Sequence, residues 1–559
     1  MHKAFRVNPR FALICGLAIL GVLLLKTLYK PNPKKPYSPA RTSHGDPELA
    51  LNFEGLINSI DQEASQKTSR ATPQGQRYET QLPRGAIPNQ RVLRFATDEE
   101  LEQFREIADR YGLKTIGVIS AYRAIAVEFE NLYQFGNVLE QAPEPLGIDF
   151  NYRISIPPFS NAENKSFNPA DYQSFHNNLV DWLGLNLSQA SRNVPIIIAL
   201  LDTPIRPHSA IPAGRVISMP PPKSDLLNQP ETAASGHGTA IASILVGNHP
   251  LVPGIAPQSI IHSIPVLGND GYGDSFTLAQ GIQMALQSGA RIINLSLGSA
   301  GDSSLLREAI ADALARKVFV VAAAGNQGQP RVAFPAAYPG VLSVGAVDAA
   351  GKHLPFSNTG YDLVLTAPGW GINAAWKDEA FVRFSGTSAA APVVSGAIVH
   401  LLNKFPSLTP QSLIQMLQTY SDDSGAPGYD PIYGHGMINI MRLLNQDIPN
   451  LRDVAIVSHH VPDEVGDLIP VQISVQNRGT RSESNIYVDV NMSWLPTQRL
   501  YFPMLGIGQT ASQTLFIPRR DLEQRGQIEL TSTVNMPQWS GGKKQTLQTL
   551  ITRDQFKQP

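Results

Sequence analysis

Apolar runs alternate with stretches rich in small residues over residues 195–445. Each run is nearly continuous in apolar character, which is typical of strands in a parallel sheet that helices cover on both faces. The pattern therefore predicts an α/β domain with a mostly parallel sheet. Its strands are expected at Ile196–Leu201, Ile261–Leu267, Arg291–Leu297, Val318–Ala324, Val341–Val347 and Leu363–Ala367.

A smaller region, residues 90–142, carries both strand and helix periods. Thr97 and Glu100 have the spacing of a capping box, and the apolar residues that follow fall on one helical face. The order β-α-β-β-α predicts a small α+β domain, and residues 143–194 form a connecting segment and the start of the α/β domain. The elements are expected at Val92–Phe95, between Thr97 and Gly112, and at Thr115–Ile119, Ala124–Phe129 and Leu132–Leu139.

The last region, residues 446–559, alternates apolar and polar side chains at period two, with turns between the runs. This pattern predicts a β-sandwich. We expect the pair His459 and His460 to lie in a solvated loop. The predicted strands are Val454–Val457, Ile469–Val475, Ile486–Met492, Thr514–Ile517 and Ile528–Val534.

The first 30 residues have the layout of a signal peptide or a membrane anchor. Basic residues precede the apolar run Phe11–Leu25, and no cleavage site of the A-x-A type follows it closely. Both alternatives stay open, because the run is only marginally long for a membrane span. The pattern of residues 31–89 predicts a mostly extended tether, with a short helix at Leu49–Ile60.

Composition excludes some classes of function and site but does not identify the function. The 559 residues carry 45 Lys and Arg against 46 Asp and Glu, so no overall positive charge is available to attract nucleic acid. Cys15 is the single cysteine, which leaves neither an internal disulfide nor a multi-cysteine zinc site. The 44 glycines and 44 prolines indicate many turns.

Three segments of the α/β domain present a reactive side chain at the end of a strand or the start of a helix. Asp202 closes the run Ile196–Asp202, His237 stands between two glycines before an apolar helix, and Ser388 opens the helix of Ser385–Gly396. Each residue alone has an ordinary structural explanation. Together they supply an alcohol, an imidazole to remove its proton, and a carboxylate to orient the imidazolium, as a serine nucleophile requires.

The chain resembles the subtilisin-type serine proteases, in which the same three residues follow in the order Asp, His, Ser. The resemblance covers about residues 180–445 and implies a three-layer subtilisin-like domain. Further matching motifs are Asn294–Gly298, Ala322–Asn326, Phe334–Pro339, Val344–Asp348, Phe356–Asn358, Ala367–Gly369 and Tyr433–Gly436.

The resemblance implies a serine endopeptidase that acts on protein or peptide substrates through an acyl-enzyme. Asn326 and the backbone N–H of Ser388 would form the oxyanion hole. The implied substrate-binding residues are Ser296, Leu297, Gly298, Ala324 and Gly325. No cofactor is certain; structural calcium is possible only by the resemblance, and no metal ligand is named.

The loop Gly268–Asp274 lacks the acidic spacing of an EF-hand, and its place beside the family's cleft makes an edge-strand loop the preferred interpretation. One departure from the family concerns Pro204, which stands where a glycine is usual two residues after the catalytic Asp. Proline fixes φ and removes an N–H, but we expect the site to tolerate it.

The flanking regions resemble known modules more weakly. The α+β domain is similar to the subtilisin-type propeptide, which assists folding and occupies the cleft, so residues 141–193 would contain a cleavage or docking segment. The C-terminal sandwich is similar to CARDB-type adhesion modules. The chain is expected to be exported, and either anchored in the membrane or secreted. The alternative to an enzyme is an inactive subtilase fold that binds peptides or partners.

Overall fold

The computed structural model describes residues 82–157, 168–185, 194–462, 466–536 and 546–552, all within one compact unit. The predicted signal or anchor, the tether and the helix at Leu49–Ile60 lie outside these residues. Among the helices that are described, none is long and apolar enough to cross a membrane.

The N-terminal domain contains the predicted order β-α-β-β-α and one further strand. Its elements are β1 (Ala86–Arg94), α3 (Asp98–Arg110), β2 (Lys114–Ile119), β3 (Ala124–Glu128), α4 (Leu132–Gln141) and β4 (Gly147–Ser155). Thr97 and Glu100 form the predicted capping box at the start of α3. Leu101 and Phe104 of α3 and Phe135 of α4 are buried in one core with the sheet.

Strand β4 was not predicted, because the region was assigned to a connecting segment. It pairs antiparallel with β1 on one side and with β10 (Tyr272–Asp274) on the other. The sheet order is therefore β10-β4-β1-β3-β2, in which β10 comes from the next domain. The loop Gly268–Asp274 thus contains the edge strand that was expected.

The central domain is built on a seven-stranded sheet of order β14-β13-β12-β11-β5-β9-β6, and every pairing within it is parallel. All six predicted strands are present. The strands are β5 (Ile197–Asp202), β6 (Val216–Ser218), β9 (Ile260–Pro265), β11 (Ile292–Leu295), β12 (Phe319–Ala323), β13 (Leu342–Val347) and β14 (Leu365–Pro368).

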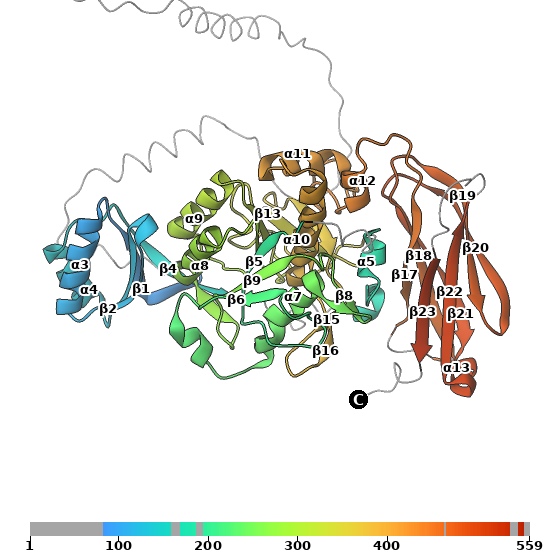
Figure 1. Ribbon diagram of the computed structural model, residues 1–559, viewed down its shortest axis with the longest axis horizontal. Coiled ribbons are helices and arrows are strands. Elements are labelled where there is room, and N and C mark those ends of the chain that lie inside the picture. Colours follow the sequence, from blue (N-terminus) through green and yellow to red (C-terminus); the bar gives the residue numbers. More distant parts are fainter. Residues whose placement is uncertain (1–81, 158–167, 186–193, 463–465, 537–545, 553–559) are drawn as a thin grey trace, which may run out of the picture. The chain divides into compact units, whose positions relative to one another are not determined.

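Helices cover both faces of this sheet (Figure 1). Ile198 and Leu200 of β5 share a core with α7 (His237–Val246) and α10 (Thr387–Lys404). The alternate residues Ala199 and Leu201 share the opposite core with α8 (Ser275–Gln287) and α9 (Ser304–Ala315). The period of two along a strand therefore produces a three-layer α/β domain.

Short elements complete this domain. They are α5 (Leu179–Trp182), β7 (Asn248–His249), β8 (Val252–Pro253), β15 (Ile372–Ala375), β16 (Phe381–Phe384), α11 (Pro410–Tyr420) and α12 (Ile440–Leu444).

The C-terminal region places a three-stranded sheet, β17-β18-β21, and a four-stranded sheet, β20-β19-β22-β23, around one apolar core. Strands β20 and β23 were not predicted, because β20 is mostly exposed and offers little apolar alternation. The elements are β17 (Val454–His460), β18 (Leu468–Asn477), β19 (Glu483–Met492), β20 (Leu495–Leu505), β21 (Thr510–Pro518), α13 (Arg519–Arg525), β22 (Gln527–Asn535) and β23 (Thr546–Thr552).

The expectation of a solvated histidine pair was wrong. His459 and His460 are both buried in β17, since α5 of the central domain and the second sheet pack against this strand. His459 Nδ1 lies 2.9 Å from Thr549 Oγ1, and Ser174 N donates to His460 Nδ1 over 3.4 Å. Burial lowers the pKa of His459 to about 3, so this imidazole is neutral near pH 7.

A buried carboxylate joins the central domain to the sandwich. Asp422 accepts hydrogen bonds from Arg442 Nη1 at 2.6 Å, Asn439 Nδ2 at 2.9 Å and, across the contact, Gln476 Nε2 of β18 at 2.9 Å. The negative charge therefore has a cation and two amides as partners, as burial of a charge requires.

Replacing Asp422 by Ala should destabilise the protein strongly. Arg442 would keep its buried charge without a counter-ion, which costs about 3–5 kcal/mol in comparable cases. Asp423→Ala is the matched control, because this neighbouring carboxylate is exposed. Calorimetric melting of the full chain measures the effect, and equal melting temperatures for the two variants would contradict the expectation.

Candidate active site

The carboxylate and the imidazole predicted from the sequence are in contact. Asp202 is the last residue of β5, and His237 is the first residue of α7. His237 Nδ1 lies 2.7 Å from Asp202 Oδ1, and both side chains are buried. The carboxylate can therefore hold the ring so that Nε2 faces away from it.

Pro204 does not displace this carboxylate. The backbone N–H of Thr203 donates to Asp202 Oδ1 over 2.7 Å, and the Thr203 hydroxyl accepts from the N–H of Gly238 over 2.9 Å. A Cβ on Gly238 would stand only 2.3 Å from the Thr203 carbonyl oxygen, so the glycine allows this approach. The turn after β5 is thus tied to the start of α7 before Pro204 is reached.

Ser388 is the second residue of α10, after the N-cap Gly386 at φ 130°. Its Oγ donates to the carbonyl oxygen of Ser296 over 3.3 Å. Within the described residues, no hydrogen bond joins Ser388 to His237 Nε2. Catalytic hydrogen bonds are often long or misaligned in the absence of substrate.

The amide of Asn326 has a defined orientation. Its Oδ1 accepts from the N–H of Thr387 at 2.9 Å and from the Thr387 hydroxyl at 2.8 Å. An amide whose oxygen faces two donors must turn its Nδ2 the other way. That Nδ2 donates to the backbone carbonyl of Pro157 over 3.2 Å.

The residue Pro157 belongs to a segment that lies between two backbone edges. The N–H of Ser155 donates to the carbonyl of Gly298 over 3.0 Å, and the N–H of Gly298 donates back over 2.9 Å. On the other side, Ile156 donates to the carbonyl of Gly271 over 3.1 Å. The segment 153–157 therefore forms the middle strand of a short antiparallel arrangement.

The remaining predicted substrate residues have different positions. Ser296 and Leu297 are buried and precede the pairing residue Gly298, while Gly325 lies beside the segment, in a pocket that Pro157 also lines. The carbonyl of Ala324 accepts from Ala333 at 2.9 Å and from Asn358 Nδ2 at 3.0 Å. Ala324 therefore contributes its backbone to the wall of the cleft.

Sequence reasoning missed two parts of this site. It did not identify Thr387 as the residue that orients Asn326, although Thr387 lies next to Ser388 in the matched motif. It also did not predict the position of segment 153–157, which the alternation of buried Tyr152 and Ile154 with exposed Arg153 could have indicated.

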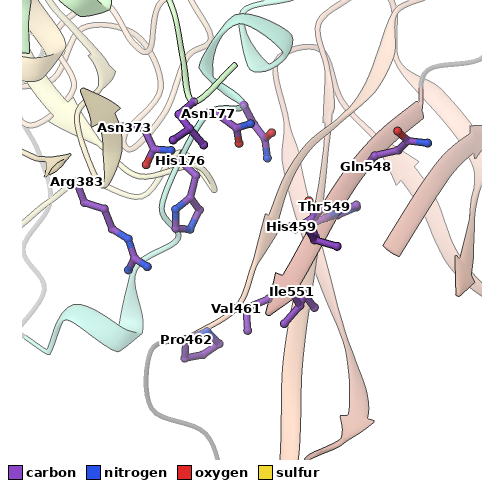
Figure 2. A pocket seen from close by; sticks show the side chains of 13 residues that line it. His176, Asn177, Asn373, Arg383, His459, Val461, Pro462, Gln548, Thr549 and Ile551 are labelled. Atoms are coloured by element: carbon purple, nitrogen blue, oxygen red, sulfur yellow. Dashed lines mark hydrogen bonds between the residues drawn. The ribbon is translucent and has the colours of Figure 1, made fainter. Parts of the chain in front are cut away.

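Another pocket, of about 310 Å³, lies between the central domain and the sandwich. Figure 2 shows His176, Asn373 and Arg383 on one side of it, and His459 and Thr549 on the other. It contains none of the predicted site residues. Among the described residues, no group of three His, Cys, Asp or Glu side chains could hold a metal ion, and the calcium expectation remains a prediction.

Comparison with known proteins identifies the central domain. The model of the Subtilase family matches residues 195–436. Subtilisin DY of Bacillus licheniformis is 35% identical over 215 residues, which are 37% of this chain and 77% of the relative. Subtilisin BL of Lederbergia lenta is 34% identical over 245 residues, which are 43% of this chain and 88% of the relative.

The thermostable alkaline protease of Halalkalibacterium halodurans is 34% identical over 250 residues, which are 44% of this chain and 66% of the relative. The similarity thus spans about two thirds or more of each relative, and the family model falls on the three-layer domain. The chain belongs to the subtilase family of serine endopeptidases.

Proposed function

We propose that the chain hydrolyses peptide bonds through Asp202, His237 and Ser388, with an acyl-enzyme intermediate. In this mechanism His237 Nε2 takes the proton of the Ser388 hydroxyl while Oγ attacks the peptide carbonyl. His237 then returns the proton to the leaving amine, and water hydrolyses the ester by the same route. Asp202 stabilises the imidazolium that forms in both steps.

Asn326 supplies the side-chain donor of the oxyanion hole in this proposal, together with the N–H of Ser388. Donors that are already oriented stabilise a developing oxyanion without further reorganisation. The two hydrogen bonds from Thr387 hold Asn326 in the orientation that this role needs. Thr387 is therefore a positioning residue.

One observation carries the proposal: a segment of the chain itself lies on the cleft in the manner of a substrate. Its backbone pairs with Gly298 and Gly271, and its Pro157 carbonyl accepts the hydrogen bond from Asn326. An oxygen at this donor belongs to the carbonyl that Ser388 would attack. Recognition through the backbone would tolerate many substrate sequences.

This arrangement supports a propeptide-like role for the N-terminal domain, which would inhibit the enzyme while its last strand fills the cleft. Residues 153–157 would be the docking segment. We also propose that the chain is exported, on the evidence of the basic and apolar pattern at its N-terminus, and is either anchored or secreted. The sandwich would serve as a CARDB-like adhesion module.

Labelling with a fluorophosphonate probe tests the nucleophile. We expect the probe to label Ser388 once the cleft is accessible, and Ser388→Ala to abolish the labelling. Mass spectrometry of the labelled peptide identifies the residue. Absence of label on Ser388 in a folded chain whose cleft segment has been removed would favour the inactive, peptide-binding alternative.

Replacing Asn326 by Ala should lower kcat far more than it changes KM, since the donor acts on the transition state. The expected loss is about a hundred- to a thousandfold, the range known for this donor in subtilisin itself. Initial rates on a peptide substrate measure it. Asn248→Ala is the control, because this exposed asparagine lies beyond the C-terminal end of α7, and a loss of less than tenfold in Asn326→Ala would argue against an oxyanion role.

The bond presented to Ser388 in the intact chain should resist cleavage, because the residue after Pro157 is Pro158. An X–Pro bond has no N–H, and its ring carbon crowds the nitrogen that His237 must protonate. We expect Pro158→Ala to permit self-cleavage after residue 157, as detected by N-terminal sequencing. The wild-type chain and the Pro158→Ala, Ser388→Ala double variant should stay uncut there; cleavage in either would contradict this account.

A further inference from the structure

In the proposed function, the pocket beside Pro157 would receive the side chain of the residue whose carbonyl is attacked. Pro157 itself lines this pocket, which has a volume of about 400 Å³. Its walls come from Gly298–Ala300, from Gly325, Gln327 and Gln329, and from Arg331–Phe334, with Asn358. A proline ring is small for such a space, so the pocket can take a longer side chain.

The charged side chains that line this pocket are all positive. Three of its lining residues, Arg84, Arg153 and Arg331, are arginines, and none is Asp or Glu. Arg84 and Arg153 belong to the N-terminal domain. Arg331 belongs to the subtilase domain, between β12 and β13, and therefore remains in the pocket for any substrate.

Two uncharged polar side chains of the pocket, Asn358 and Gln327, make hydrogen bonds within its wall. Asn358 Oδ1 accepts from the N–H groups of Gln327 at 3.1 Å and Gln329 at 2.9 Å, and Asn358 Nδ2 donates to Gln327 Oε1 over 3.1 Å. These bonds fix the loop 325–329. Arg331 is exposed, and within the described part of the chain it takes part in no ion pair.

We propose that Arg331 makes this enzyme prefer substrates with an acidic side chain, above all glutamate, immediately before the scissile bond. A guanidinium presents paired N–H donors that match a carboxylate, and a lysine or an uncharged amide cannot reproduce that match. This inference rests on the proposed function. It adds the substrate class that the pocket selects.

The test uses the full chain carrying Pro157→Ala and Pro158→Ala, which should open its own cleft by self-cleavage. Peptides that repeat Ile154–Ile156 and end in Glu or Gln before a fluorogenic amide are compared by kcat/KM. We expect the Glu peptide to be about tenfold better at low salt, the size of one charge-assisted hydrogen bond. Added salt should reduce the ratio, since the arginine is exposed.

The decisive variant is Arg331→Ala in the same background. It should bring the Glu-to-Gln ratio close to one, mainly by lowering kcat/KM on the Glu peptide. Arg291→Ala is the matched control, because Arg291 is an exposed arginine at the opposite end of the sheet, before β11. It should leave the ratio unchanged.

Two outcomes overturn the proposal: a Glu-to-Gln ratio near one in the parent chain, or a ratio that Arg331→Ala leaves intact. Either can occur in an enzyme that cleaves the Gln peptide and is labelled at Ser388, so the proposed function would then survive. If neither peptide is cleaved and Ser388 is not labelled, the proposed function itself fails.

Discussion

The arrangement of the cleft depends on the orientation of one amide side chain, that of Asn326. Because Thr387 donates twice to Asn326 Oδ1, Asn326 Nδ2 faces the cleft and meets the carbonyl of Pro157. In the proposed function, that contact marks the carbonyl that would be attacked, and with it the pocket that would receive the side chain of the same residue. Had the amide been free to turn, neither the scissile position nor the pocket beside it could be assigned from the backbone alone.

The parallel sheet explains why these groups converge. Its strands are mostly apolar on both faces, and two polar side chains of the site lie at their carboxyl ends, where Asp202 closes β5 and Asn326 follows β12. Ligands of open α/β sheets bind outside the carboxyl ends of the strands. The helices α7 and α10 begin at that edge and bring His237 and Ser388 to it.

The sequence predicted those parts of the fold that are determined by local hydrophobic periodicity and by side chains close together in the chain. The six apolar runs became six parallel strands, and Thr97 and Glu100 formed the expected cap. Strand β4 was missed because its partner β10 lies more than a hundred residues away, and such pairing leaves no local signature. His459 and His460 were misjudged for a similar reason, since the second sheet and α5 of the central domain, which pack against β17, are distant from it in the sequence.

The predicted site likewise contains residues that the sequence identifies and contacts that it does not. Asp202, His237 and Ser388 were found from residue types whose chemistry is complementary, and the structure joins the first two directly. The contact between Ser388 and Ser296 depends on a side-chain rotation that no sequence pattern encodes. The position of Pro157 depends on the pairing of β4 in the N-terminal domain with β10 in the central domain. The alternation of buried and exposed residues before Pro157 was a sequence signal for this strand.

Affinity and selectivity come from different atoms in this cleft. The segment 153–157 is held by backbone hydrogen bonds to Gly271 and Gly298, which any extended peptide except one with an ill-placed proline can make. The pocket beside Pro157 adds no such bond to a proline ring, which has no polar atom to offer Arg331. In the proposed function, a segment of this kind would bind through its backbone without using Arg331, and Pro158 would protect its bond from attack. Under the proposed function, tight binding and slow cleavage, the two properties of a built-in inhibitor, would follow from these two adjacent prolines.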